Sequence, residues 1–231
     1  CVAPATAQEL ELVAAGYTDV TDFRGGLREW ESAGYEVVSD GPMPKPPVPN
    51  GHYAINLDTS VVRWTGRNLF NHHHGTIKLG GGQLEVRDGQ LISSTFTLDM
   101  NSIANEDLTD PQWNAMLIRH LRDEDFFAVD RFPTATFVSR AVTPVLDAVP
   151  GTPNFEVAGE LTIRGVTGPL VFKAVIAAAD EDHLTGQAQF EIDRTEFGSH
   201  YGSGKLFAFL GKHIVNDHVH LHVKIQAERA A

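Results

Sequence analysis

The stretch Leu161-Thr-Ile-Arg-Gly-Val-Thr-Gly168, continued by Pro169-Leu-Val-Phe-Lys-Ala-Val-Ile176, alternates apolar and polar side chains on both sides of a glycine-bounded turn. Because successive side chains of a strand point to opposite faces, each arm has one apolar and one polar face. The apolar face carries Val157, Gly159, Leu161 and Ile163 before the turn, and Leu170, Phe172, Ala174 and Ile176 after it. We therefore predict a β-hairpin with its turn over Gly165–Gly168, whose two strands present one continuous apolar surface.

The same alternation recurs along the chain from about residue 60 to the end. It predicts strands at 60–65, 76–79, 83–86, 91–100, 135–142, 155–164, 173–179, 184–193 and 218–227. Strands at such regular spacing, joined by turns, are typical of an antiparallel sandwich or barrel. The sequence thus predicts a mainly β fold.

One helical segment interrupts the strands. A proline start and the preceding Asp110 as N-cap predict a helix over 111–121, which 123–129 extends. Its apolar stripe consists of Trp113, Met116, Leu117 and His120. We expect this stripe to pack on the sheet.

Composition and charge limit the classes of partner. The chain has 231 residues, of which 42% are hydrophobic, and its formal net charge is −12. This charge disfavours nucleic acid or an anionic membrane surface as the main partner, because both attract lysine and arginine. No run of about 18 apolar residues is present, so we expect no transmembrane segment. A single cysteine excludes an internal disulfide and a zinc site of the CxxC kind.

Proline is concentrated at residues 39–51, which predicts a semi-rigid polyproline II linker. The linker separates a small α/β fragment at 1–38 from the β domain at 52–231. In the fragment we predict a helix over 6–15, a strand over 20–23 and a helix over 27–33 that ends at Gly34. The chain begins at Cys1 rather than at Met, from which we expect a processed chain or a fragment.

Several short motifs of the β domain occur in an order shared with a known family. They are Leu57-Asp-Thr-Ser-Val-Val-Arg-Trp-Thr-Gly66, His73-His-Gly-Thr-Ile77, Met100-Asn-Ser-Ile103, His120-Leu-Arg-Asp-Glu-Asp-Phe-Phe127, Phe132-Pro-Thr-Ala-Thr-Phe137, the hairpin above and Ile192-Asp-Arg-Thr-Glu-Phe-Gly198. In this order the segment from about residue 52 to 227 resembles the YceI-like domain, a bacterial lipocalin-like β-barrel associated with polyisoprenoid and quinone-type lipids.

The resemblance implies an antiparallel barrel of about eight strands with a short helical insertion. It also implies binding or transport of an apolar isoprenoid lipid, polyprenyl or quinone-like, without catalysis. A periplasmic or secreted location follows from the same resemblance, while a cytoplasmic location and a homodimer are both compatible with the sequence.

A barrel of this size holds either side chains or one ligand. The resemblance implies that in-facing apolar residues line a tunnel for the lipid. The predicted ligand-binding residues are Trp64, Ile77, Phe96, Leu98, Met100, Phe137, Leu161, Ile163, Leu170, Phe172 and Phe190. The alternative is that the same residues simply fill a core, as most buried aromatic residues do.

A charged cluster lies at Asp193, Arg194 and Glu196. We interpret it as a structural corner in which Arg194 pairs with a carboxylate at the end of the barrel. No catalytic role is needed to explain it.

Histidine is clustered at 72–74 and again at 213, 218, 220 and 222. On a strand, His218, His220 and His222 share one face, and the valine and leucine residues between them face inward. The histidines then point outward, where they are candidate ligands of zinc or copper if a neighbouring strand supplies a further donor. Two alternatives are a polar outer face that happens to use histidine and a pH-responsive surface. We expect metal binding to be the less favoured reading.

Residues 1–38 resemble the C-terminal part of a rhodanese domain, in which a cysteine before a helix carries sulfur as a persulfide. Cys1 occupies the place of that cysteine and is the candidate nucleophile. The loop after Cys1 is about two residues short, lacks the usual arginine and has no preceding strands. Sulfurtransferase activity is therefore an alternative function that requires a longer parent protein to supply the missing half.

Overall fold

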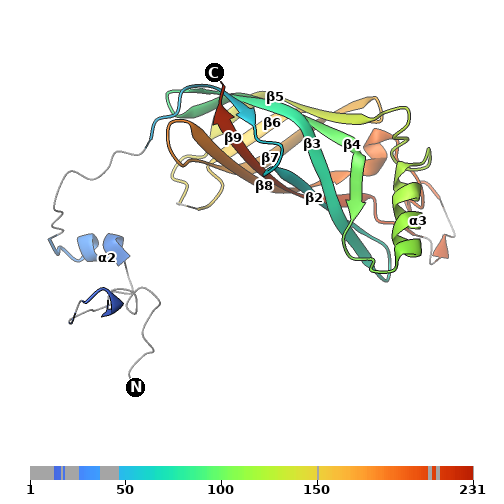
Figure 1. Cartoon of the computed structure of the whole chain (residues 1–231), viewed down its shortest axis with the longest axis horizontal. Helices are drawn as coiled ribbons and strands as arrows, with labels where there is room; N and C mark the ends of the chain where they lie inside the picture. The colour runs from blue at the N-terminus through green and yellow to red at the C-terminus, as the bar shows by residue number, and fades with distance from the viewer. Residues whose placement is uncertain are drawn as a thin grey trace. The chain divides into compact units, whose positions relative to one another are not determined.

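The computed structural model describes residues 13–16, 18, 26–36, 47–149, 151–207, 210–211 and 214–230. The chain divides into two units, Cys1–Pro46 and Pro47–Ala231 (Figure 1). In the first unit, α2 (Gly26–Ser32) agrees with the helix predicted over 27–33, and Gly34 with its φ of 80° follows the helix. Cys1, the strand predicted over 20–23 and most of the helix predicted over 6–15 lie outside the described residues.

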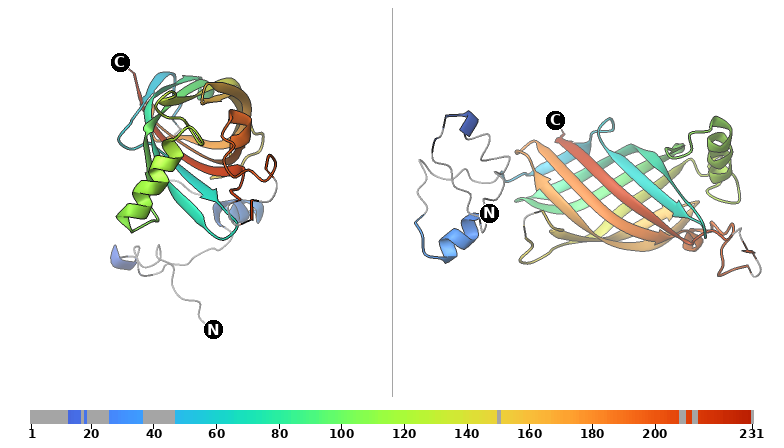
Figure 2. Two further views of the ribbon diagram at one scale, coloured as in Figure 1. Left: turned by 90° about the vertical axis from the view of Figure 1, so that its right-hand side faces the viewer. Right: turned by 90° about the horizontal axis from the view of Figure 1, so that it is seen from below.

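The second unit is built on one antiparallel sheet that closes on itself (Figure 2). Its strands are β1 (Gly51–Ile55), β2 (Val61–Arg67), β3 (His72–Arg87), β4 (Gln90–Asn105), β5 (Thr134–Pro144), β6 (Phe155–Ile163), β7 (Val166–Ala178), β8 (His183–Asp193) and β9 (His218–Arg229). The strand order is β1-β3-β2-β9-β8-β7-β6-β5-β4, and pairing of β3 with β4 closes the ring. The predicted barrel of about eight strands is confirmed, with β2 to β9 as its members.

Strands β1 and β2 share one position in the ring. Both pair with β3 on one side and with β9 on the other, at different heights. Gln226 of β9 holds the segment between them in place. The Asn56 N–H donates to Gln226 O at 2.8 Å, and the Gln226 N–H donates to Ser60 Oγ at 2.9 Å. The sequence did not predict β1.

The predicted hairpin is confirmed as β6–β7, but its turn is shorter than predicted. Ile163 pairs with Val166, so Arg164 and Gly165 alone form the turn, with φ of 53° and 73°. Two successive positive φ values give the tight turn whose twist matches that of the strands. The Arg164 guanidinium donates to the backbone oxygens of Glu124 and Phe126 and so ties the turn to the segment that follows α3.

The two strands predicted at 76–79 and 83–86 are in fact one long strand, β3. The strand passes through Gly80-Gly81-Gly82 with register shifts against β4 rather than ending there. Glycine is needed at two of its positions, because a Cβ on Gly75 would lie 1.8 Å from Ala104 O and one on Gly82 would lie 2.7 Å from Thr95 O. The bulges let β3 bend around the barrel.

Helix α3 (Pro111–Arg122) joins β4 to β5 at one end of the barrel. Asp110 is its N-cap, as predicted, and accepts from the N–H groups of Gln112 and Trp113 at 2.8 and 3.2 Å. The predicted extension over 123–129 is wrong, since the helix ends at Arg122 and turns follow. The predicted packing of the stripe is wrong for Trp113 and Met116, which are 59% and 45% exposed. Among the described residues, no helix has the length and apolar character needed to cross a membrane.

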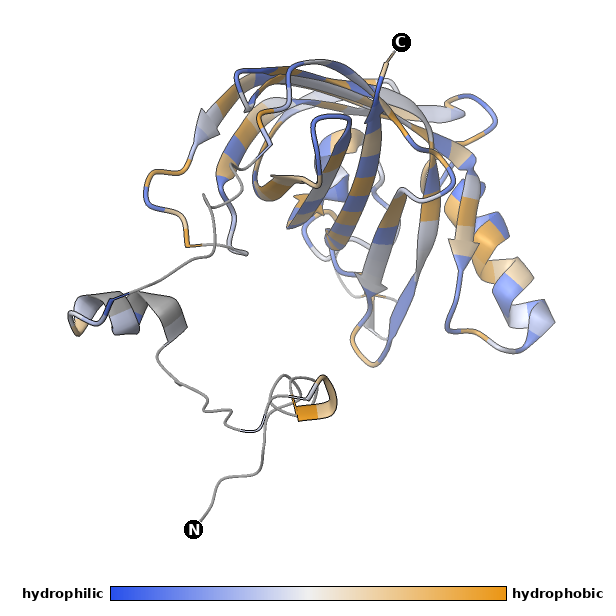
Figure 3. Cartoon of the chain, turned by 60° about the vertical axis from the view of Figure 1, so that its left-hand side comes forward, coloured by the Kyte–Doolittle hydropathy of each residue, from blue (hydrophilic) through white to orange (hydrophobic). Residues whose placement is uncertain are grey.

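The strands alternate in polarity along their length, as the stripes of Figure 3 show. Apart from residues such as the buried Ser94 of β4, inward residues are apolar, and they form one cluster with the inner side of α3. The barrel therefore has a single apolar interior, whose contents decide its function.

Candidate ligand-binding cavity

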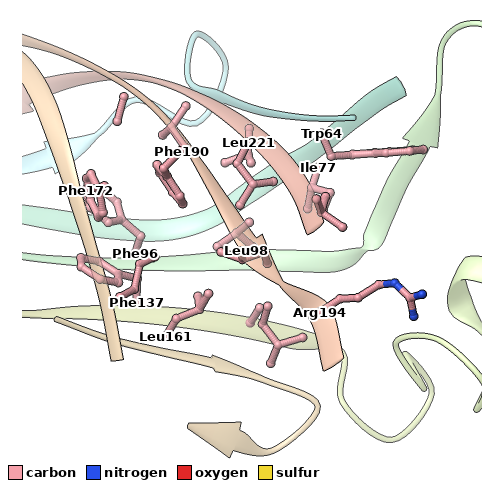
Figure 4. Close-up of a pocket in the computed structure, with 18 of the residues that line it drawn as sticks. Trp64, Ile77, Phe96, Leu98, Phe137, Leu161, Phe172, Phe190, Arg194 and Leu221 are labelled. Carbon is pink, nitrogen blue, oxygen red and sulfur yellow. The ribbon is translucent and has the colours of Figure 1, made fainter. Parts of the chain in front are cut away.

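The interior is hollow. It encloses a cavity of about 360 Å³ with walls from strands β2 to β9 (Figure 4). All of the predicted ligand-binding residues line it: Trp64, Ile77, Phe96, Leu98, Met100, Phe137, Leu161, Ile163, Leu170, Phe172 and Phe190. Each comes from an in-facing strand position, which the alternation of the sequence identified, whereas the expectation of a tunnel came from the family resemblance.

Several of these side chains point inward and yet are only half-buried. Phe96, Phe172 and Phe190 are examples, and Val219, Leu221 and Val223 of β9 behave in the same way. In a filled core such residues would be covered by their neighbours on the opposite wall. Their partial exposure is exposure to the cavity, so the residues line a space rather than fill a core.

Four phenylalanine rings form one continuous aromatic wall. The ring centroids of Phe96 and Phe137 are 6.3 Å apart, those of Phe137 and Phe172 are 5.4 Å apart, and those of Phe172 and Phe190 are 4.7 Å apart. Gly159 makes room for this wall, because a Cβ there would lie 2.6 Å from Cζ of Phe137. The wall presents ring faces and edges to whatever occupies the cavity.

Small residues at in-facing positions keep the space open. They are Ala135, Ala174, Gly186 and Ala188, all of which line the cavity. Ala174 of β7 and Ala188 of β8 pair directly, so two small side chains face the interior side by side. Sequence reasoning did not single them out as site residues, although the alternation Leu184, Gly186, Ala188, Phe190 marks Gly186 and Ala188 as in-facing and small.

The cavity is closed at the β1 end and open at the α3 end. At the closed end, Tyr53, Val86, Phe155 and Ala227 are buried without lining the cavity. At the α3 end the wall includes the exposed residues Arg67, Asn68 and Tyr201, so it reaches the solvent. A long ligand would therefore enter and leave at the α3 end.

Arg194 stands at this end of the cavity, in the 3₁₀ helix η1 (Arg194–Phe197). Its guanidinium is buried and donates to the backbone oxygens of Asn216, Ser199, Tyr201 and Val215 at 2.7 to 3.2 Å. The predicted pairing with a carboxylate is confirmed by Asp217, whose Oδ1 lies 3.5 Å from Nη2. Burial lowers the pKa of Arg194, while the charges of Asp217 and Asp193 act in the opposite direction.

Asp107 fixes the wall at the open end. Its carboxylate accepts from the His74 N–H and from Asn105 Nδ2, and it lies 2.8 Å from Nδ1 of His73. Burial raises the pKa of Asp107, but these hydrogen bonds outweigh burial and hold the pKa at about 2. An ionised carboxylate only accepts, so Nδ1 of His73 carries the proton and the imidazole that lines the cavity has a fixed orientation.

The charge of the lining is unevenly distributed. Among the described residues, the ionisable side chains on the cavity wall are Arg67, His73, His120, Arg194 and Tyr201, all toward the α3 end, and no carboxylate, lysine or cysteine lines it. None of these lining residues supplies a pair of carboxyl groups for acid–base chemistry. The wall is a long apolar surface whose ionisable side chains all lie at one end.

The predicted orientation of the last strand is confirmed. Val219, Leu221 and Val223 line the cavity, whereas His220 and His222 are exposed and His218 is half-buried. Glu191, which the sequence analysis did not include, lies against two of the histidines, 3.3 Å from Nδ1 of His218 and 3.7 Å from Nδ1 of His220.

The two histidine clusters are not brought together. Thr65 of β2 pairs with His74 on one side and with His220 on the other, so a whole strand separates the clusters. Two strand spacings place the backbones of the clusters about 10 Å apart. In the part of the chain that the structure describes, no three histidine, cysteine or acidic side chains gather to hold a metal ion.

Comparison with known proteins identifies a family. The family model described as the YceI-like domain matches residues 53–227. Curated relatives include a UPF0312 protein of Pseudomonas fluorescens, 38% identical over 85 residues (35% of this chain, 43% of that protein), and one of Shewanella denitrificans, 34% identical over 149 residues (63% and 68%). A UPF0312 protein of Vibrio vulnificus is 28% identical over 137 residues, which are 59% of this chain and 64% of that protein. The matches therefore span 43% of the Pseudomonas fluorescens protein and 64% of the Vibrio vulnificus protein.

Two solved structures have the same fold. BcnA of Burkholderia cenocepacia superposes with a TM-score of 0.58 at 24% identity, covering 74% of this chain and 98% of that one. A polyisoprenoid binding domain from Saccharophagus degradans, implicated in plant cell wall breakdown, superposes with a TM-score of 0.53 at 15% identity, covering 77% and 98%. At these identities the likeness is one of fold alone.

Proposed function

Because this chain belongs to the YceI-like domain family, we propose that its barrel binds or carries one apolar lipid of the isoprenoid class, polyprenyl or quinone-like, without chemical conversion. The observation that carries the proposal is the hollow, aromatic-walled cavity, which is closed at one end and has its ionisable side chains only at the other. The name of the structural neighbour from Saccharophagus degradans, a polyisoprenoid binding domain, agrees with it.

The chemistry of the wall favours a long tail over a charged ligand. Each methylene that leaves water for such a wall contributes about 0.8 kcal/mol, so a tail of several isoprene units is retained without any ion pair. The polar groups at the α3 end, among them Arg67 and His73, are then left for the head of the molecule. The lipid lies with its tail toward β1.

Organic extraction followed by mass spectrometry tests the proposal directly. We expect protein purified without detergent to release one isoprenoid lipid per barrel. Repeated preparations that contain no lipid, and that also fail to take up an added polyprenol, would contradict the proposal.

A cavity-filling variant makes the test specific to the interior. Ala188 faces the cavity and Gln189, the next residue of β8, is exposed on the outer surface. We expect Ala188→Phe to reduce bound lipid at least several-fold, and Gln189→Phe, which adds the same ring outside, to leave it unchanged. In a filled core the larger ring would cost about 1–3 kcal/mol in stability, whereas in a hollow it should cost little, as urea denaturation would show.

A further inference from the structure

Exposed apolar side chains surround the open end of the barrel. Three separate segments each contribute two such side chains, and we call these six residues the rim. They are Leu69 (59% exposed) and Phe70 (75%) between β2 and β3, Trp113 (59%) and Met116 (45%) on α3, and Leu206 (52%) and Phe207 (50%) after η1. Large apolar residues grouped in this way on a surface are typical of a contact site.

The three elements lie together at the α3 end of the barrel (Figures 1 and 2). Asn68 forms a bridge with Val215, and Asn216 N donates to Arg67 O at 2.8 Å, which joins the β2–β3 tip to the chain after η1. His120 of α3 packs edge-on against Tyr201, with ring centroids 4.4 Å apart. The rim is thus held to the barrel by hydrogen bonds and ring contacts behind it.

The most exposed pair is held in place by its own turn. Asn68 Oδ1 accepts from the N–H groups of Phe70 and Asn71 at 2.8 and 2.7 Å, and Asn68 N donates to Asn71 O at 2.8 Å. These bonds fix the backbone while Leu69 and Phe70 project into solvent. No side chain in the described part of the chain covers Phe70, which keeps three quarters of its surface exposed.

A second pocket lies between the rim and the cavity. This pocket, of about 510 Å³, lies beside α3 and is lined by Trp113 and Met116 of the rim together with Leu108, Arg119 and Asp123. Its remaining wall residues, His73, Leu117 and His120, also line the main cavity. The two spaces therefore share a wall formed by these three side chains, which places the outer pocket directly beside the open end of the cavity.

We propose that the rim docks this end of the barrel on a neutral lipid bilayer, so that the tail passes between the membrane and the cavity without crossing water. The proposal rests on the proposed function, because the bilayer is the source of a water-insoluble tail. Tryptophan, phenylalanine and leucine are the side chains that insert at the boundary of head groups and tails. A net charge of −12 disfavours an anionic surface, so the attraction is apolar rather than electrostatic.

The opposite end of the barrel provides a matched control. Leu146 and Val149, between β5 and β6, are 86% and 56% exposed but lie at the closed end of the cavity. We expect Leu69→Ser with Phe70→Ser to lower partitioning onto phosphatidylcholine vesicles about tenfold or more, and Leu146→Ser with Val149→Ser to leave it unchanged. Co-sedimentation of the full chain with the vesicles measures both.

Other outcomes separate docking from lipid binding. The Leu69→Ser, Phe70→Ser variant should still retain lipid taken up from solution, and Ala188→Phe should still bind vesicles. Vesicle binding that persists in the rim variant, or that falls equally in the control, overturns the docking proposal. The proposal is also overturned if the wild-type chain does not bind vesicles but forms a dimer through the rim. Analytical ultracentrifugation would then detect a dimer in the wild type and a monomer in the rim variant.

Discussion

Arg194 is a buried cation whose role is structural. Its guanidinium binds four backbone oxygens of the segment between η1 and β9, and its charge lies 5.3 Å from the centre of the Phe126 ring. One side chain therefore holds together the chain after η1, the segment after α3 and the start of β9. These are the parts that frame the open end of the cavity.

Replacement of Arg194 by methionine should be strongly destabilising. The variant leaves the Asp217 carboxylate buried without its counter-ion and the backbone oxygens without their donor, for which a loss of about 3–5 kcal/mol is typical. Lys205→Met is the control, because Lys205 is exposed at its ion pair with Asp193 and its replacement should cost much less stability than that of Arg194. Urea denaturation of both variants measures the difference, and equal losses would contradict the structural role.

Asp107 should make the stability of the protein depend on pH. Its pKa is about 2 in the folded state against a usual 3.8, so its stabilising contribution is complete above about pH 4 and is lost as the pH falls toward 2. We expect the free energy of unfolding of Asp107→Asn to lie below that of the wild type at pH 5, with a gap that narrows by about 1 kcal/mol toward pH 2. Denaturation curves between pH 5 and 2 measure the gap, and a constant gap would contradict the assigned hydrogen bonds.

At the residue scale, period-two alternation identified which side chains point inward, and the residues chosen from it, from Trp64 to Phe190, line the cavity. It did not show whether the interior is filled. Whether it is filled depends on the summed volume of the side chains that face one another across the barrel. Small residues such as Ala174 and Ala188 leave space because they lie side by side on paired strands. The contacts of Glu191 and Asp107 with histidines likewise arise from strand register, which one sequence does not display.

At the scale of elements, the β6–β7 hairpin depends on its two-residue turn. Gly165 has a φ of 73°, and a Cβ there would lie 2.8 Å from Cε1 of Phe132. We expect Gly165→Ala to destabilise the protein by about 1–3 kcal/mol, since both backbone strain and crowding oppose it.

Gly168 is the control for this prediction. It lies in β7, and a Cβ there would meet Phe197 at 3.3 Å, without a positive φ. Gly168→Ala should therefore cost less than Gly165→Ala in thermal or urea denaturation. The reverse order would favour the longer turn that the sequence alone suggested.

Elements with regular alternation and clear boundaries were predictable, and those shaped by bulges were not. The N-cap Asp110 and the proline start located α3, and the apolar rows located β4 to β9. The glycine run of β3 predicts a break because glycine usually marks a turn, whereas in the structure the strand continues and Gly82 permits close approach of β4. Strand β1 was missed because it is short and is defined by its partners β3 and β9.

At the scale of the whole molecule, the barrel should fold without the preceding residues. The ring closes through β3–β4 within residues 47–231. We expect a chain that begins at Pro47 to have the same free energy of unfolding as the full chain, within about 0.5 kcal/mol, and the same lipid content per molecule. Chemical denaturation and lipid extraction of both chains measure this, and a large loss of either would show that residues 1–46 complete the barrel.

The unfilled interior also makes the folded barrel more voluminous than its unfolded chain in water. Apolar walls do not hold water well, so the space of about 360 Å³ disappears when the chain unfolds. Hydrostatic pressure favours the state of smaller volume, so a barrel without lipid should unfold at lower pressure than a barrel whose cavity holds lipid. The pressure at which the protein unfolds thus distinguishes the empty barrel from the lipid-filled barrel without any label on the lipid.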